Sequence, residues 1–237
     1  MNRSALIKDP VACYKEHGFA ILVAYPESHK NITDYATTWL NTLLGLNLGA
    51  TDLKQYHHWF ETQDIHHNAL FSAKNRHRLP EPKLSNMLLN SAVQQFLKKI
   101  IPQDYDLWDD GDGWLAFRFI RPAYHDGYPF SCKAWGPAKN VISAWLPIIG
   151  FDAHCTLKML PGSHIKTFAH HLPTESKFCK EEFRLCNEPT TLEIYQPELE
   201  PGDIIFFHPK LIHSEDVSTG DTTRFSLEFR LLPKAGI

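Results

Sequence analysis

Several features that would place a protein in a familiar class are missing from this 237-residue chain. Its five cysteines are odd in number and include no Cys-x-x-Cys pair, so the sequence indicates neither a disulfide framework nor a zinc site. No stretch approaches the roughly 18 consecutive apolar residues of a membrane-spanning helix, and no apolar segment follows the N-terminus as in a signal peptide. We therefore expect a cytoplasmic protein with no membrane partner.

Clustered positive charge is also missing. The formal net charge is -3, and lysine and arginine form no patch that would suit nucleic acid. Histidine is abundant, with 14 residues, but several occur as adjacent pairs. Adjacent side chains point to different sides of a helix or strand, which suits a single metal ion poorly. The sequence therefore indicates neither a nucleic-acid partner nor a metal site built from the adjacent histidine pairs.

The length and the 43% hydrophobic content are sufficient for one core, so we expect a single domain over residues 1–237. Residues 1–112 have mostly helical patterns, and from residue 113 short apolar runs alternate with turns. Helices that precede strands, without strand–helix alternation, predict a mainly β protein with helices (α+β), in which an antiparallel core is backed by the N-terminal helices.

Individual elements follow from the same patterns. Helices are expected over 10–17, 32–44, 52–62, 64–76 and 85–101, and the acidic stretch 104–112 is expected to be a solvated loop. Strands are expected over 19–24, 114–120, 141–149, 156–160, 191–195, 204–207 and 223–232.

The last of these strands has one apolar and one polar face. Its polar positions alternate with phenylalanine and leucine, and they are Arg224, Ser226, Glu228 and Arg230. Arg224 and Ser226 therefore point the same way. His213 stands at the end of the preceding strand. A histidine that faces an Arg-x-Ser pair across neighbouring strands can hold a metal ion beside a dicarboxylate.

The C-terminal half resembles the phytanoyl-CoA dioxygenase-like branch of the iron(II)- and 2-oxoglutarate-dependent oxygenases. The resembling segments are FRFIRP at 117–122, SAWLPIIG at 143–150, LKMLPGSH at 157–164, FFHPKLIH at 206–213 and TRFSLEF at 223–229. The resemblance implies a double-stranded β-helix, or cupin-like jelly roll. It also implies an oxidoreductase that uses iron(II) and 2-oxoglutarate on a small polar molecule. Members from bacterial surface-polysaccharide gene clusters are the most similar in character, which suggests a sugar or nucleotide-sugar.

The resemblance also implies roles for single residues. Members of the family bind iron through a His-x-Asp or His-x-Glu pair and a distal histidine, and the other metal positions stay open. His213 matches the distal histidine. Arg224 matches the residue that pairs with the C5 carboxylate of 2-oxoglutarate through its guanidinium fork, and Ser226 matches the hydroxyl that assists it. The Pro-Gly-Ser-His turn at 161–164 is expected to brace the site.

The His-x-Asp or His-x-Glu pair is missing where the family has it, between Trp114 and Trp145. In one alignment His125 and Asp126 take its place. Consecutive side chains diverge, so both bind a metal only if the chain turns or bulges there. With His125 alone, the His-x-Gly reading resembles halogenating relatives that have lost the carboxylate.

A second alignment overlays residues 129–135 on the family pattern without a gap. Ser131 and Lys133 then occupy the ligand positions. A lysine ammonium near His213 would put positive charge where iron belongs, and the protein would be a metal-free homologue that binds or scaffolds. A loop that contacts no metal is the third interpretation, and the sequence leaves all three open.

Overall fold

The structure is a computed structural model that describes residues 2–44, 47–60, 82–108, 114–124, 126, 130–132, 140–151, 155–168, 170–171, 183–185, 193–215 and 220–234. Its helical elements are α1 (Arg3–Lys8), α2 (Pro10–His17), α3 (His29–Leu44), η1 (Asp52–Gln55), α4 (Tyr56–Phe60), α6 (Pro82–Leu88), α7 (Ser91–Ile100) and η4 (Ser163–Ile165). Its strands are β1 (Phe19–Val23), β2 (Tyr105–Leu107), β3 (Leu115–Ile120), β4 (Ser131–Cys132), β5 (Ile142–Ile149), β6 (Lys158–Met159), β7 (His170–His171), β8 (Phe183–Leu185), β9 (Asp203–Phe207), β10 (His213–Ser214) and β11 (Arg224–Pro233).

Local signals in the sequence determine where α2 and β1 lie. Asp9 caps α2 by accepting a hydrogen bond from the backbone of Ala12 at 3.0 Å, and Pro10 occupies its first turn. Gly18 ends the helix with a φ of 83°, a left-handed conformation that glycine adopts without strain. The chain then enters β1 directly, as the sequence predicts.

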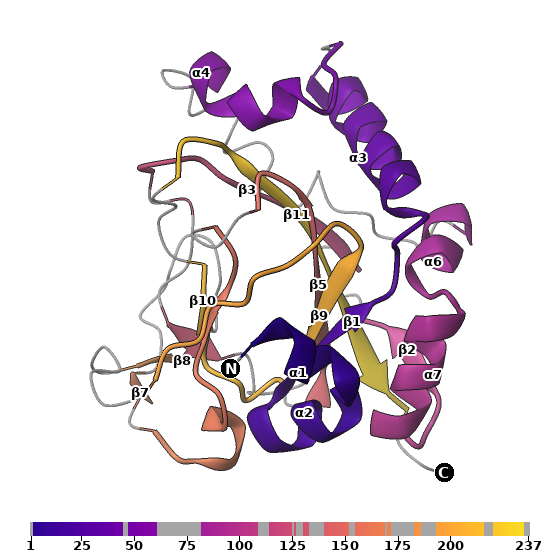
Figure 1. Cartoon of the computed structure of the whole chain (residues 1–237), viewed down its shortest axis with the longest axis vertical. Helices are drawn as coiled ribbons and strands as arrows, with labels where there is room; N and C mark the ends of the chain where they lie inside the picture. The colour runs from indigo at the N-terminus through magenta and orange to yellow at the C-terminus, as the bar shows by residue number, and fades with distance from the viewer. Residues whose placement is uncertain are drawn as a thin grey trace.

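The larger sheet is built around β11. Its strand order is β1-β9-β5-β11-β2, and β3 also pairs with β11. Every pairing is antiparallel, with β5 on one side of β11 and β3 followed by β2 on the other. Helices α3, α6 and α7 cover the outer face of this sheet (Figure 1). Phe225, Leu227, Phe229 and Leu231 of β11 are fully buried in that outer layer.

The smaller sheet faces the inner side of the larger one and has the order β6-β10-β4-β8-β7. Its strands have only two or three residues. An apolar cluster lies between the sheets and includes Phe19, Trp145, Met159 and Phe207. Two antiparallel sheets around one interior, with helices on one side, confirm the predicted mainly β architecture with helices.

Several predicted elements differ from the structure. The helix expected over 85–101 is two helices, because Asn90 accepts a hydrogen bond from the backbone of Val93 at 3.1 Å and starts α7 as a new cap. The acidic stretch expected to be a loop contains β2, whose Leu107 pairs with Leu231 of β11. In the strand expected over 191–195, the described residues form one bridge, between Tyr195 and Met159.

The helix expected over 52–62 begins as the 3-10 helix η1 and continues as α4. The helix expected over 64–76 lies outside the described residues. Among the helices that the structure describes, none has both the length and the apolar character needed to cross a membrane.

Candidate functional site

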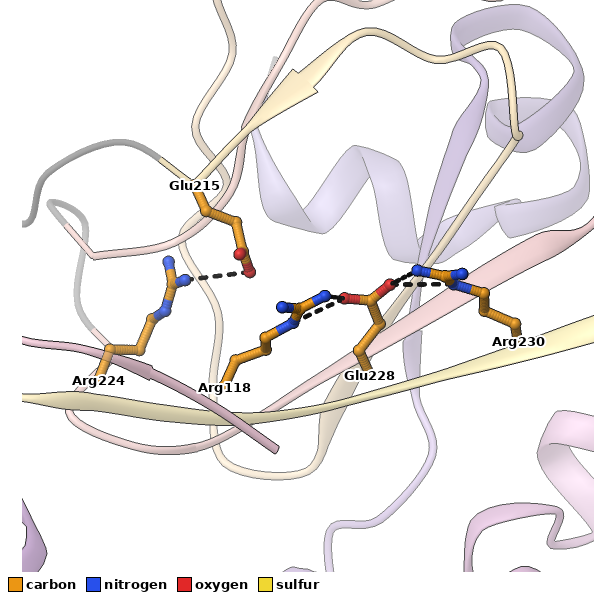
Figure 2. A network of polar contacts seen from close by, with 5 residues as sticks. All are labelled: Arg118, Glu215, Arg224, Glu228 and Arg230. Carbon is orange, nitrogen blue, oxygen red and sulfur yellow. Dashed lines mark hydrogen bonds and ion pairs between the residues drawn. The ribbon is translucent and has the colours of Figure 1, made fainter. Parts of the chain in front are cut away.

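The inner face of β11 carries a row of buried charges (Figure 2). Arg224 is 1% exposed and Glu228 is 5% exposed. Arg118 of β3 joins the row because it lies opposite Ser226 in the strand register. Glu228 accepts hydrogen bonds from Arg118 Nε at 3.2 Å and from Arg230 Nη2 at 3.1 Å. Its carboxylate thus bridges two guanidinium groups inside the barrel.

Arg224 has a different set of contacts. Its Nη1 donates to the Cys155 carbonyl at 3.0 Å, and its Nη2 donates to Glu215 Oε1 at 3.2 Å. Its guanidinium carbon lies 5.3 Å from the centre of the Trp145 ring. Burial lowers the pKa of Arg224 from its ordinary value, and the carboxylate of Glu215 opposes that shift. The guanidinium is therefore held in position, and the carboxylate of Glu215 balances part of its positive charge.

Two polar atoms beside this contact are buried without a hydrogen-bond partner among the described residues. They are Arg224 Nε and Ser226 Oγ. An unpaired buried polar group costs about 1–3 kcal/mol, so such gaps are typical of places that receive a ligand. A carboxylate accepts hydrogen bonds from a guanidinium and a hydroxyl together. Arg224 and Ser226 therefore fit one carboxylate of 2-oxoglutarate.

His213 faces the same interior from the opposite sheet. It is 6% exposed, and its ring lies 4.6 Å from the ring of Phe207 on β9. Its Nδ1 lies 2.9 Å from the Leu211 carbonyl, which can only accept, so Nδ1 carries the proton. The lone pair of a neutral ring is then on Nε2, the tautomer that a metal-binding histidine needs.

The position next to His213 is occupied by Ser131. The two residues are direct register partners where β10 pairs with β4, and Ser131 is buried. This is the strand position that the gapless alignment gives to the first iron ligand. Lys133, the second residue of that alignment, and His125 of the other lie outside the described residues.

Asp126 is engaged elsewhere. Its two carboxylate oxygens accept from Arg121 Nε and Nη2, both at 2.9 Å, and Oδ2 also accepts from the Arg121 backbone at 2.8 Å. This fork-to-fork pair is of the strong bidentate kind. In this structure the Asp126 carboxylate therefore serves as the counter-ion of Arg121.

The described residues fit iron less well than they fit a dicarboxylate. Within the described part of the chain, no group of three or more histidine, cysteine, aspartate or glutamate side chains is placed to hold a metal ion. The carboxylates of Asp126 and Glu215 are both paired with arginine. Of the predicted ligands that the structure describes, His213 remains a candidate, and the described residues do not complete an iron site by themselves.

Glu215 is the residue of this site that sequence reasoning missed. Its position two residues after His213 could have revealed it, because side chains two residues apart in an extended segment point to the same side. Glu215 follows His213 by two positions and reaches Arg224 across the interior, as Figure 2 shows.

The Pro-Gly-Ser-His turn lies behind His213. Gly162 adopts a φ of 74°, and Ser163 Oγ accepts a hydrogen bond from the backbone of Ile212 at 2.9 Å. The Gly162 amide donates to the His17 carbonyl at 2.9 Å. The turn therefore connects the end of α2 to the residue that precedes His213.

Comparisons with known proteins agree with this architecture. No curated protein sequence matches the chain. Among solved structures it is similar to the "non-heme alpha ketoglutarate dependent carbocyclase SnoK from nogalamycin biosynthesis", with a TM-score of 0.61 and 12% identity over 98% of this chain and 86% of that one. It is also similar to AviO1 from Streptomyces viridochromogenes Tue57, with a TM-score of 0.59 and 14% identity over 98% of this chain and 96% of that one.

A third similar structure is EctD from S. alaskensis with 2-oxoglutarate and 5-hydroxyectoine, with a TM-score of 0.60 and 11% identity over 94% of this chain and 74% of that one. At identities this low, the structural similarity shows a shared jelly-roll fold and no more. The sequence model described as "Phytanoyl-CoA dioxygenase (PhyH)" matches residues 49–225, well over half of the chain. The chain therefore belongs to the phytanoyl-CoA dioxygenase family, and its fold is that of the iron(II)- and 2-oxoglutarate-dependent oxygenases.

Proposed function

We propose that this chain is a 2-oxoglutarate-dependent oxygenase that acts on a small polar molecule such as a sugar or nucleotide-sugar. The observation that carries the proposal is the pair of buried atoms Arg224 Nε and Ser226 Oγ, which have no hydrogen-bond partner among the described residues and lie in the interior that His213 also faces. Family membership supports it, as do similar structures described as alpha-ketoglutarate dependent or containing 2-oxoglutarate.

The roles of the residues follow from their contacts. Arg224 binds one carboxylate of the co-substrate, and the Cys155 carbonyl and the Trp145 ring hold its guanidinium in place. Ser226 donates to the same carboxylate. His213 presents Nε2 to the interior as a metal ligand. Iron(II) would supply the oxygen chemistry, and its further ligands would have to come from outside the described residues, where His125 is the candidate.

Anaerobic addition of iron(II) and 2-oxoglutarate to the purified chain tests this proposal. We expect the visible charge-transfer band of a metal-bound 2-oxo acid. Arg224→Lys keeps the positive charge but loses the fork, so its band should need more 2-oxoglutarate. The lack of any band from the wild type at saturating iron(II) and 2-oxoglutarate would contradict the proposal.

A second candidate function is a metal-free binding protein, and one observation favours it. Ser131 is the register partner of His213, where an iron-binding member needs a ligand. Metal analysis after purification with iron present separates the two functions. Stoichiometric iron that is lost in both His125→Ala and His213→Ala supports the oxygenase. A wild type that retains no iron supports the binding protein.

A further inference from the structure

We propose that Glu215 is an internal competitor for the carboxylate site on Arg224, and that a dicarboxylate ligand must displace it to bind. The inference rests on the proposed function, because it concerns the same arginine. It adds a residue that controls how tightly the co-substrate is held.

The contact between Glu215 and Arg224 uses only part of the guanidinium. Nη2 donates to Oε1 at 3.2 Å, and Nε has no partner among the described residues. Two other arginines of the chain form complete forks. Arg3 pairs with Asp203 at 2.7 and 2.9 Å, and Arg121 pairs with Asp126 at 2.9 Å through both Nε and Nη2. Glu215 thus makes one hydrogen bond to its arginine, whereas Asp203 and Asp126 each make a bidentate pair. Bidentate pairs are the stronger kind, so the Glu215 contact is the weaker one.

Burial explains why a displaceable carboxylate is present at all. Arg224 is 1% exposed and Glu215 is 5% exposed, so neither charge is solvated by bulk water. A buried guanidinium without a counter-ion is strongly destabilising. In the ligand-free protein Glu215 supplies that counter-ion. A ligand carboxylate that binds Nε and Nη2 together would supply it in the same place, so the two carboxylates exclude each other.

The charge balance of the interior favours an incoming anion. Figure 2 shows a network of two neighbouring groups, Arg224 paired with Glu215, and Glu228 paired with Arg118 and Arg230. Arginines outnumber glutamates in this network, so it has an excess of positive charge when all five side chains are ionised. Glu228 is already bound by two arginines, whereas Glu215 contacts Arg224 alone within the network. Glu215 is thus the carboxylate that a ligand can replace at least cost.

The consequence is a measurable penalty on dicarboxylate binding. A protein whose binding-competent state is only partly populated binds its ligand more weakly by that fraction. Glu215→Gln removes the competing charge and keeps the size of the side chain. Glu228→Gln is the matched control, because it removes a carboxylate from the same network that does not contact Arg224.

The experiment is a calorimetric titration of the full chain with 2-oxoglutarate and with succinate, in the presence of EDTA so that no metal takes part. We expect Glu215→Gln to bind both dicarboxylates about tenfold more tightly than the wild type. Glu228→Gln should show a clearly smaller gain, because its carboxylate does not contact Arg224 and changes only the overall charge of the interior. Equal or weaker binding by Glu215→Gln, an equal gain in Glu228→Gln, or no binding by any of the proteins would overturn the inference.

Folding of the variants is followed separately. If Glu215→Gln is unstable without ligand, both Glu215→Gln and Glu215→Ala are refolded with and without 2-oxoglutarate, and recovery of folded protein only with the dicarboxylate supports the inference. If neither variant folds under either condition, a ligand cannot replace the Glu215 carboxylate, and the inference fails. Tighter binding by Glu215→Gln without an iron band in the wild type contradicts only the proposed oxygenase. An iron band without tighter binding contradicts only the role of Glu215.

Discussion

The two faces of β11 are buried to the same degree and are built from opposite chemistry. The outer face presents Phe225, Leu227, Phe229 and Leu231 to the helices, and all four are 0% exposed. The inner face presents Arg224, Ser226 and Glu228, which are 1%, 0% and 5% exposed. Apolar burial stabilises the fold without further conditions, whereas buried charge is tolerated only where partners compensate its desolvation.

The outer face maintains the fold through apolar packing, and the inner face is the one on which we propose the ligand site. On the outer face the Phe225 ring stacks on Phe119 at 4.4 Å and on Phe117 at 5.8 Å. On the inner face, Arg224 and Ser226 each have a buried polar atom without a hydrogen-bond partner in the described part of the chain. Apolar side chains would fill a jelly-roll interior without the desolvation penalty of buried charges, so stability alone does not account for this polar face.

The largest effect is expected from truncation on the outer face. Phe225→Ala removes a fully buried aromatic ring from between two others, so we expect a loss of about 4 kcal/mol in the free energy of unfolding. Urea unfolding measures it. A loss below about 1 kcal/mol would mean that this face contributes far less to stability than its packing indicates.

A somewhat smaller loss is expected on the inner face, and it should be reversible. Glu228→Met removes the carboxylate that pairs with the buried Arg118 guanidinium, which should cost about 3 kcal/mol. The double variant with Arg118→Met should recover much of that loss, because an apolar pair of similar size replaces the ion pair. Urea unfolding of both variants measures these losses. A double variant that is less stable than Glu228→Met would contradict the interpretation that the buried ion pair can be replaced by an apolar pair.

A third variant tests whether the Asp126 carboxylate stabilises the fold or binds a metal ion. Asp126→Asn weakens the fork with Arg121, whose side chain is 4% exposed, so we expect a loss of about 2 kcal/mol in stability. Metal analysis provides the second readout. Because the carboxylate is paired with arginine, the iron content should stay at the wild-type value. A selective loss of iron at unchanged stability would return Asp126 to the metal site.

The smallest effect concerns pH and a histidine outside this interior. Burial, together with the neighbouring His164 and Lys210, lowers the pKa of His208 from 6.5 to about 4. The unfolded chain therefore binds a proton more readily than the folded chain. The stability that His208 contributes is complete above pH 6.5 and declines as the pH falls toward 4. Melting temperatures of the wild type and of His208→Asn, measured across this range, should differ most at high pH and converge at low pH.

Much of the larger sheet and its helices is predictable from the sequence because their signals are local. The Asp9 cap with Pro10 and Gly18 predicts α2, and the alternation after residue 223 predicts β11 with both of its faces. The division between α6 and α7 was missed because Asn90 lies inside a continuous apolar stripe, where its capping role is not apparent. The strand β2 was missed because its three residues pair with a strand that is distant in sequence.

The candidate site was predictable only in part. Arg224, Ser226 and His213 were predicted from their spacing and from the family resemblance, and their roles stay predictions. The expectation that His213 lies on a strand next to Arg224 was wrong, because β10 belongs to the smaller sheet and β11 to the larger one. The contact between Glu215 and Arg224 was not, because it joins two sheets and no local pattern specifies it. Which residue lies beside His213 depends on the register of β10 with β4, and in the structure that residue is Ser131. The two alignments that the sequence left open differ in that register.

The central claim is that Arg224 on the inner face of β11 binds the co-substrate. Its most direct test is a titration of the anaerobic iron(II) protein with 2-oxoglutarate, in which binding is followed through the visible band. The account predicts saturable binding by the wild type, and at least about tenfold weaker binding by Arg224→Lys, which lacks the fork. Equal 2-oxoglutarate affinity in the two proteins, or no band in the wild type, would contradict it.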